Sequence, residues 1–207
     1  GRDMLSRLLY AVRPTMMMVA TVALVRLVLG TLIGVAAGWS SGWLSRFFEN
    51  LISWALAVPV LMVALCAIAV VGIEWGLPAF IVGFSINGWA ETARVVRDQT
   101  RSLKGQEFIT AAYAMGALDL HIIFRHVMRH ILPFVWMLFA LEISGTLMVT
   151  AGLGFLGYYI GGDVWVVVSD FVARRTSGEP ELGQMLSTAW SRLTEPWPLV
   201  TTGSTVF

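Results

Sequence analysis

The sequence is poor in charge, in cysteine and in lysine, and each shortage excludes a class of protein. Charged residues make up 13% of the 207 residues, against roughly a quarter in an ordinary soluble domain. The single cysteine, Cys66, excludes an intrachain disulfide. The net charge of +1 gives no support for a nucleic-acid partner. The only lysine, Lys104, is not part of a GxxxxGK[ST] phosphate-binding loop, so any ATP hydrolysis has to reside on another subunit.

Hydrophobic residues instead make up 57% of the chain. They are gathered in runs of about 20 residues, the length at which a helix crosses a hydrocarbon core. Helices are expected because backbone polar groups in lipid must be satisfied within their own segment. The sequence therefore predicts an all-α integral membrane protein, a polytopic helical bundle. The predicted spans are residues 15–38, 51–72, 78–96 and 131–151, and a fifth begins near Trp197.

The positive charges predict the orientation of these spans. The loop between the third and fourth spans holds six of the fourteen cations, namely Arg94, Arg97, Arg101, Lys104, Arg125 and Arg129. The positive-inside rule places this loop in the cytoplasm. The loop at about 152–195 carries five acids and three arginines, which suits the outer side. Residues 1–14 hold three arginines and fall outside by parity, but the longer and more basic loop decides the orientation.

Glycine and proline within the spans indicate where helices pack and bend. Gly30, Gly34 and Gly38 are four residues apart, so they lie on one face of the first span and allow a neighbouring backbone to approach closely. Pro59 falls in the middle of the second span. It predicts a kink, because proline removes a helical hydrogen bond and crowds the preceding turn.

Ionisable side chains lie inside the predicted spans, where a charge in the hydrocarbon core costs free energy. Their presence can be interpreted in two ways. Arg26 and Glu142 fall in the first and fourth spans, where they either line a polar pathway or are structural, as a mutual ion pair or with Arg26 reaching an interface. If they pair, exchanging the two charges should rescue either single reversal. The third span is unusually polar on its cytoplasmic side, which suits a pathway or a bundle contact; its polar residues are Ser85, Asn87 and Glu91.

The cytoplasmic loop is predicted to form two helices separated by a glycine. Arg94, Arg97, Arg101 and Lys104 form one stripe on a helix that leaves the membrane, suited to anionic headgroups. In QEFITAAYAMG, small alanines give a slim helix that Gly116 ends. A second helix opens near Asp119, and Pro133 marks the next span. The apolar residues of this second helix have helical spacing and are predicted to form its inward face; they are Leu120, Ile123, Phe124, Val127, Met128 and Ile131. His121, Arg125 and Arg129 are predicted to lie on the opposite face.

This loop could serve to bind a metal ion, to bind lipid or to bind a protein partner. His126 and His130 are four residues apart, but no third ligand is near, so no metal site is predicted. An amphipathic helix can also lie on lipid. The glycine turn with a bare alanine patch favours a docking surface for a protein partner.

This loop resembles that of the permease subunits of ABC importers, whose motif runs roughly EAA, three residues, Gly, nine residues, I-x-LP. Thr110, Ala111, Ala112 and Gly116 match its first half, with Thr110 in place of the glutamate and Glu107 three residues earlier. The second half departs, since His126, Met128 and Arg129 stand at the I-x-LP positions. GRDMLSRLLYAVR, the segment from GWAETARVV to FRHV, and GFLG are similar to the dipeptide/oligopeptide/nickel subgroup.

The resemblance implies a single transmembrane domain over residues 1–207, a fragment of a six-span subunit that lacks its first span and is truncated in its last. It implies a coupling segment at about 105–130, with residues 107–118 as the main contact of the ATPase and Asp119 opening the second helix. It also implies the cytoplasmic membrane, a second permease subunit, two ATP-binding subunits holding ATP and magnesium, and an extracytoplasmic solute-binding protein. Transport follows by alternating access, without catalysis on this chain. The alternative is a stand-alone secondary transporter or channel that uses Arg26 and Glu142.

The outer loop departs from that subgroup at residues 158–186. The stretch from Trp165 to Val168 is apolar and is predicted to be re-entrant or interfacial, while residues 181–186 are the counterpart of the subgroup's WG-x-ML segment. In the family this loop helps to receive the solute, so the departure concerns the choice of partner or substrate.

Overall fold

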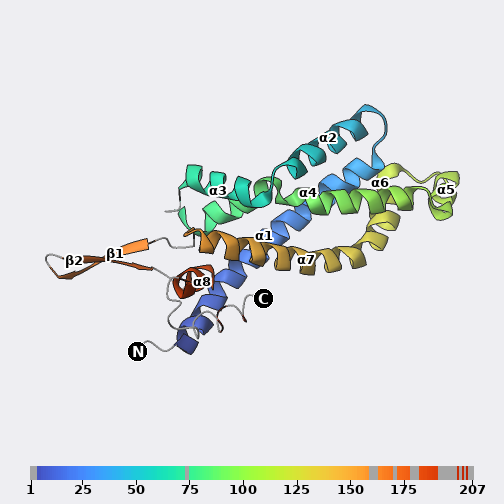
Figure 1. The fold of residues 1–207 in the computed structure, drawn as a ribbon. Helices are drawn as coiled ribbons and strands as arrows, with labels where there is room; N and C mark the ends of the chain where they lie inside the picture. The colour runs from blue at the N-terminus through green and yellow to red at the C-terminus, as the bar shows by residue number, and fades with distance from the viewer. Residues whose placement is uncertain are drawn as a thin grey trace. The chain divides into compact units, whose positions relative to one another are not determined.

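The computed structural model describes residues 4–72, 75–158, 163–169, 172–177 and 182–190 and the single positions 200, 202 and 204. The helices are α1 (Met4–Trp39), α2 (Trp43–Ala57), α3 (Val60–Val71), α4 (Leu77–Lys104), α5 (Glu107–Ala114), α6 (Asp119–Ile122), η2 (Ile123–Val127), α7 (Met128–Phe155) and α8 (Leu182–Trp190). The predicted helical class is confirmed (Figure 1). Apart from the single positions 200, 202 and 204, the predicted span from Trp197 lies outside the described residues, as do Gly1–Asp3.

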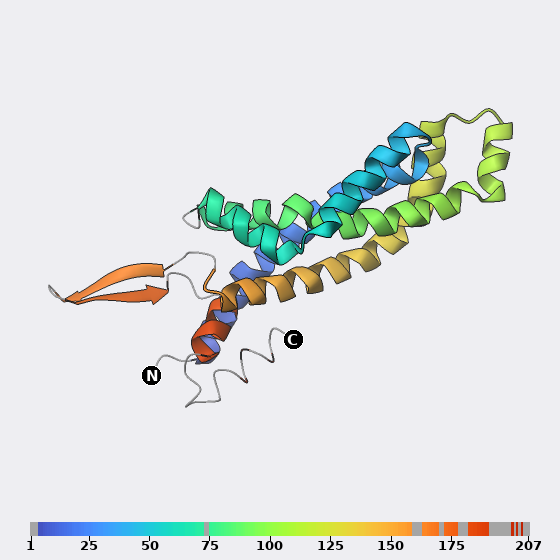
Figure 2. The same cartoon turned by 45° about the horizontal axis from the view of Figure 1, so that its top comes forward.

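One part of the chain is not helical. Strands β1 (Asp163–Ser169) and β2 (Val172–Ser177) pair antiparallel, with a bulge between Val167 and Ser169. Figure 2 shows them as a two-stranded ribbon. The stretch Trp165–Val168, predicted to be re-entrant or interfacial, lies in strand β1. The run of valines there suits a strand, because β-branched side chains are restricted in a helix and favoured on a pleated surface.

Two helices are long and apolar enough to cross a membrane by length and composition, covering Leu8–Trp39 and Asp119–Gly154. A third crossing results if α2 and α3 are counted together. The predicted third span, 78–96, lies within α4, but α4 is not among these candidates. Its Glu91, Arg94, Arg97 and other charges make it too polar.

The chain divides into two compact units. Unit 1 holds residues 1–22, 60–86 and 143–207, and unit 2 holds 23–59 and 87–142. The core of unit 1 packs α1, α3, α4 and α7 around Phe80, Phe84 and Ile68, with Met18 and Leu153 also buried. The larger core of unit 2 packs α1 and α4 against α5, α6, η2 and α7, and its fully or nearly fully buried residues include Val96, Ile109, Ala112, Ile122, Val127 and Ile131.

The glycine stripe lies against α4 within unit 2, as the spacing predicts. A Cβ atom on Gly30 would lie 2.7 Å from the Cβ of Thr92, and one on Gly38 would lie 2.6 Å from the Cβ of Thr100. Between them, a Cβ on Gly34 would lie 2.7 Å from the carbonyl oxygen of Ala93. Because such distances are shorter than van der Waals contact, only glycine permits this approach of α1 to α4.

The kink predicted at Pro59 is a complete break, since α2 ends at Ala57 and the next helix begins at Val60. Proline has no N–H, so the carbonyl of Ala55 lacks its usual partner four residues on. The Asn87 side chain supplies it, because its Nδ2 donates to the Ala55 oxygen at 3.2 Å and to the Val58 oxygen at 2.9 Å. Asn87 therefore satisfies the backbone that the proline leaves unpaired.

Candidate functional site

The most prominent local feature of unit 2 is the turn that joins α5 to α6, residues 107–122, which we call the α5–α6 turn. Glu107 lies in the first turn of α5, where its charge favours the helix N-terminus. The helix ends in a Schellman motif, in which the Ala117 N–H donates to the Ala112 carbonyl at 3.1 Å and the Gly116 N–H donates to that of Tyr113 at 2.9 Å. Gly116 has φ +82°, a conformation that favours glycine. The predicted order of helix, glycine and helix is therefore present.

A side-chain hydrogen bond closes this turn. The Tyr113 hydroxyl donates to Asp119 Oδ1 at 2.6 Å, across Gly116 from the end of α5 to the start of α6. The carboxylate as acceptor, together with partial burial, raises the pKa of Tyr113. Since the pKa in the folded state is above that in the unfolded state, the contribution to stability is complete below the ordinary tyrosine pKa of about 10 and is lost as the pH rises further. Sequence reasoning missed Tyr113, although an aromatic hydroxyl six residues before an acid across a glycine turn is a usable signal.

Replacing Tyr113 with phenylalanine is expected to loosen the turn without unfolding the protein. The ring remains, and only the hydrogen bond is lost, worth about 0.5–1.5 kcal/mol. Hydrogen exchange of the Ala117 and Gly116 amides should become faster in Tyr113→Phe, while exchange within α4 is unchanged. If both amides exchange as slowly in Tyr113→Phe as in the unaltered protein, the Schellman motif alone holds the turn.

The α5–α6 turn has an inner and an outer face. Ile109 and Ala112 are 1% exposed and belong to the core of unit 2. The other predicted contact residues are exposed, namely Glu107, Thr110, Ala111, Gly116 and Asp119. The prediction that Ala112 belongs to the outer, slim surface is therefore wrong; its methyl group faces the core and anchors the turn. Figure 1 shows α5 beside α6 at one end of α4.

The predicted inward face of the second helix is confirmed for Val127 and Ile131, which are buried, and for Ile123 and Met128, which pack against the same core, but it is wrong for Leu120 and Phe124. The helix that opens at Asp119 runs through α6 and η2 directly into α7, and Pro133 lies inside α7 instead of at a boundary. The segment η2 is a π-helical turn, which inserts one extra residue per turn. The buried residues Ile122 and Val127 are accordingly five apart. Leu120 and Phe124, predicted to be buried, are 69% and 73% exposed.

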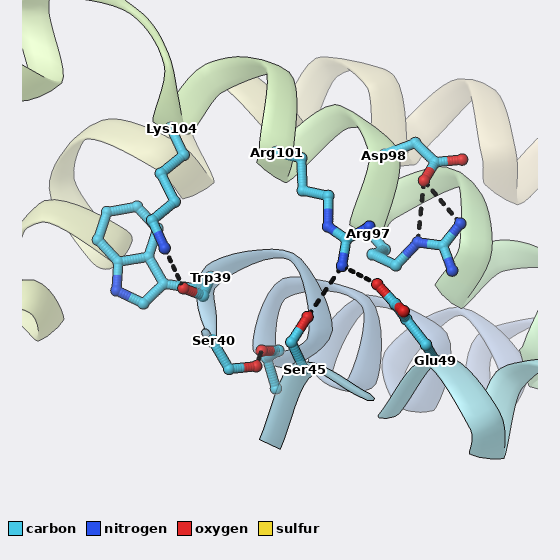
Figure 3. A network of polar contacts seen from close by, with 9 residues as sticks. Trp39, Ser40, Ser45, Glu49, Arg97, Asp98, Arg101 and Lys104 are labelled. Carbon is cyan, nitrogen blue, oxygen red and sulfur yellow. Dashed lines mark hydrogen bonds and ion pairs between the residues drawn. The ribbon is translucent and has the colours of Figure 1, made fainter. Parts of the chain in front are cut away.

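The basic stripe on α4 is mostly engaged within the chain (Figure 3). Arg101 forms an ion pair with Glu49 and donates to Ser45 Oγ at 2.9 Å. Lys104 donates to the Trp39 carbonyl at 2.5 Å, and its ammonium lies 5.4 Å from the centre of the Trp39 ring. These contacts tie the end of α4 to the end of α1 and the start of α2.

The two remaining cations of the stripe differ. Arg97 binds its neighbour Asp98, with the two nitrogen–oxygen distances at 2.7 and 2.9 Å, whereas Arg94 is exposed. The stripe predicted to bind anionic headgroups is therefore not available as a set, since three of its four guanidinium or ammonium groups bind protein oxygens.

Arg26 and Glu142 form a buried ion pair in unit 2. Arg26 Nη1 lies 3.0 Å from Glu142 Oε2, and the side chains are 6% and 8% exposed. Arg26 Nη2 also donates to the Gly88 carbonyl at 2.8 Å, and the Thr92 hydroxyl donates to Glu142 Oε1. A Cβ on Gly88 would overlap the guanidinium, so a glycine makes room for the pair. Of the interpretations open from the sequence, the mutual ion pair is the one observed.

Of the other predicted pathway residues, Glu91 is the one whose charge acts on both members of this pair. Asn87 is buried and donates to the α2 carbonyls, and Glu91 is exposed. Ser85 belongs to unit 1, where its buried hydroxyl has no hydrogen-bond partner among the described residues. Sequence reasoning missed Gly88 and Thr92, whose roles depend on contacts between α1, α4 and α7 that no local pattern records.

The histidines of the second helix make contacts within the protein. The His130 ring stacks on Phe108 with 5.1 Å between the ring centres, and its Nδ1 lies 2.7 Å from the His126 carbonyl. Within the part of the chain that the structure describes, no group of three metal-ligating side chains gathers.

Comparison with known proteins shows which proteins this chain is similar to. The glutathione transport system permease protein GsiD of Pectobacterium atrosepticum is 31% identical over 157 residues, which is 76% of this chain and 52% of that protein. The nickel transport system permease protein NikC of Escherichia coli K12 is 30% identical over 76% of this chain and 56% of its own length. The dipeptide transport system permease protein DppC of Bacillus subtilis is 26% identical over 95% of this chain and 58% of its own length. The chain thus spans just over half the length of these curated relatives.

A solved structure supports the fold. A chain of the MetNI methionine ABC transporter in an inward-facing conformation superimposes with a TM-score of 0.76 over 100% of this chain and 90% of that one, at 18% identity. Residues 30–199 match the family model of the binding-protein-dependent transport system inner membrane component. Together with its apolar helices, this match makes the chain a multi-pass inner-membrane protein. The chain belongs to the family of binding-protein-dependent transport system inner membrane components.

Proposed function

We propose that this chain is the permease subunit of an ATP-driven importer and that the α5–α6 turn receives the motion of an ATP-binding subunit. The observation that carries the proposal is the two-faced turn itself. Ile109 and Ala112 fix its inner face in the core of unit 2, while Glu107, Thr110 and Ala111 leave its outer face open. A partner that moves the outer face thereby moves the helices of that core.

Membership of the family supports the proposed assembly. The chain pairs with a second permease subunit, and two ATP-binding subunits supply ATP and magnesium. An extracytoplasmic solute-binding protein delivers the solute to the outer side, where the loop at 152–195 lies. The proposed cycle is alternating access, driven by ATP on the partner subunits. Relatives named for glutathione, dipeptide and nickel transport indicate a small solute whose identity is set mainly by the binding protein.

The alternative, a stand-alone carrier or channel, depends on Arg26 and Glu142 acting as pathway groups. These two side chains bind each other and the backbone of α4, so they are poorly placed to exchange partners with a passing solute. Transport by the purified chain without any ATPase subunit would nevertheless favour that alternative over the importer.

Replacing Gly116 with valine is expected to uncouple transport while leaving insertion into the membrane intact. At φ +82° a non-glycine residue is strained by about 1–2 kcal/mol, and more for a β-branched side chain. The Schellman motif should open, and the outer face of the turn should shift. Solute uptake per ATP hydrolysed should fall in Gly116→Val when it is measured in proteoliposomes with the partner subunits.

A matched control is Gly105→Val, which changes a glycine at the edge of the predicted coupling segment but outside the α5–α6 turn. Gly105 is exposed, its φ is not in the left-handed region, and a Cβ there meets only the Ser102 carbonyl at 3.7 Å. Coupling should therefore be retained in this variant. If Gly116→Val transports and stimulates ATPase activity as well as Gly105→Val does, the assignment of the α5–α6 turn is wrong.

A further inference from the structure

The exposed face of the second cytoplasmic helix is not used by the proposed function. Leu120, Phe124, Met128 and Leu132 follow one another at a spacing of four residues and line a shallow depression together with His121, Arg125 and Arg129. Leu120, Phe124 and Leu132 are 69%, 73% and 51% exposed. We call these seven residues the 120–132 face. It combines an apolar row with a parallel basic row.

The two arginines of the basic row have no partner among the residues that the structure describes. Arg125 and Arg129 are both exposed, and neither guanidinium takes part in a hydrogen bond or an ion pair with the residues that the structure describes. Arg97, Arg101 and Lys104 on α4, by contrast, bind protein oxygens. Two uncompensated cations, four residues apart on one helical face, are suited to an anionic ligand with several oxygen atoms.

The apolar row continues along α7 without a break. Trp136, Met137 and Leu141 are 67%, 51% and 60% exposed, and all of them lie in the candidate membrane span Asp119–Gly154. A helix that displays apolar side chains along its length and arginines only at its cytoplasmic end has the arrangement that a bilayer selects. The apolar side chains meet the acyl chains, and the long basic side chains reach the headgroups.

The π-helical turn η2 creates this face. In a regular α-helix, Leu120, Phe124 and Val127 share a side, so the apolar row would turn into the core. The extra residue in η2 places Ile122, Val127 and Ile131 inward and leaves Leu120 and Phe124 outward. The same turn therefore gives the helix one apolar face for the core and a second one for lipid.

We propose that the 120–132 face binds the cytoplasmic leaflet of the membrane, with Arg125 and Arg129 holding the phosphate of an anionic phospholipid. A protein partner is less well matched, because the apolar row is continuous with the exposed row of a membrane span and not confined to the cytoplasmic end. The anchor fixes the start of α7 at the membrane surface and leaves the α5–α6 turn free to be engaged from the cytoplasm. The proposal does not depend on the importer function.

The test uses the complete permease with its partner subunits in nanodiscs of phosphatidylcholine, with or without phosphatidylglycerol. Cys66, the only cysteine, is replaced in Cys66→Ser, and an environment-sensitive fluorophore is attached in Phe124→Cys. Brominated phosphatidylglycerol should quench this label more strongly than brominated phosphatidylcholine does. The same label in Met115→Cys, at a residue 81% exposed in the α5–α6 turn, should not be quenched by either lipid.

Arg125→Gln and Arg129→Gln should each reduce the preference for phosphatidylglycerol about fivefold. This is the change expected when a cation that attracts an anionic headgroup by about 1 kcal/mol is removed. Arg94→Gln, which removes an exposed cation of α4, is the matched control and should leave the preference unchanged. A label at position 124 that neither lipid quenches would overturn the proposal and assign the face to a protein partner. Equal quenching by the two lipids would overturn the anionic headgroup site. So would a loss of the preference for phosphatidylglycerol in Arg94→Gln as large as that in Arg125→Gln or Arg129→Gln.

Discussion

Glu142→Ala should destabilise the protein by about 3–5 kcal/mol, because it leaves the Arg26 charge buried without its counter-ion. Arg26 is 5% exposed, and its hydrogen bond to the Gly88 carbonyl, at 2.8 Å, supplies no negative charge in place of Glu142. The Thr92 hydroxyl would lose its acceptor as well. The midpoint of thermal or denaturant unfolding of the detergent-solubilised complex measures this loss.

Two further variants separate the ion pair from other roles of the same residues. Glu91→Ala removes an exposed acid from α4 and should change stability by no more than about 0.5 kcal/mol. The double variant Arg26→Met/Glu142→Met removes both charges at similar volume and should recover most of the stability lost in Glu142→Ala. If Glu142→Ala is as mild as Glu91→Ala, the site is hydrated, and the pathway interpretation of Arg26 and Glu142 regains support.

The charge exchange that the sequence suggests is now expected to rescue only in part. In Arg26→Glu/Glu142→Arg, the new glutamate would face the Gly88 carbonyl, which accepts a hydrogen bond from the native guanidinium. A carboxylate and a carbonyl repel each other at that distance. The double variant should therefore be more stable than either single reversal but less stable than Arg26→Met/Glu142→Met.

Local rules predicted much of the α5–α6 turn. Gly116 follows a short run of helix-forming residues, so a left-handed C-terminal residue and the end of α5 can be read from the sequence. Asp119 opens the next helix for a similarly local reason. The side of α5 that faces the core could not be predicted, because Ala111 and Ala112 are chemically identical and only the burial of Ala112 in the core of unit 2 distinguishes them.

Where the sequence misled, an interruption of regular geometry was responsible. The spacing of Leu120, Phe124 and Ile131 fits an α-helix, but the π-helical turn at Ile123–Val127 changes which side is buried. Nothing in the residue types of that turn forces it. Asn87 shows a related limit, because it satisfies Ala55, which is 32 residues away, and no local pattern links an asparagine to a distant proline.

The glycine stripe is the feature on which sequence and structure agree most directly, and it gives the second large effect. Gly34→Ala should destabilise the protein by about 3 kcal/mol, at the upper end of the usual cost of overpacking. The added methyl group would lie 2.7 Å from the Ala93 carbonyl oxygen and 2.7 Å from the Cβ of Val96. Neither atom is the end of a flexible side chain, so α1 and α4 have to separate along their contact.

The same substitution at Gly145 distinguishes this effect from the helix preferences of glycine and alanine. Gly145 lies inside α7, and a Cβ there meets nothing within 4 Å. Gly145→Ala should therefore be neutral or stabilising by up to about 1 kcal/mol, because alanine loses less conformational entropy in a helix. Opposite signs for the two glycine-to-alanine changes in the same unfolding assay would locate the cost at Gly34 in the α1–α4 contact. Equal values would mean that this contact is looser than 2.7 Å implies and that Gly30, Gly34 and Gly38 are ordinary glycines of a membrane helix.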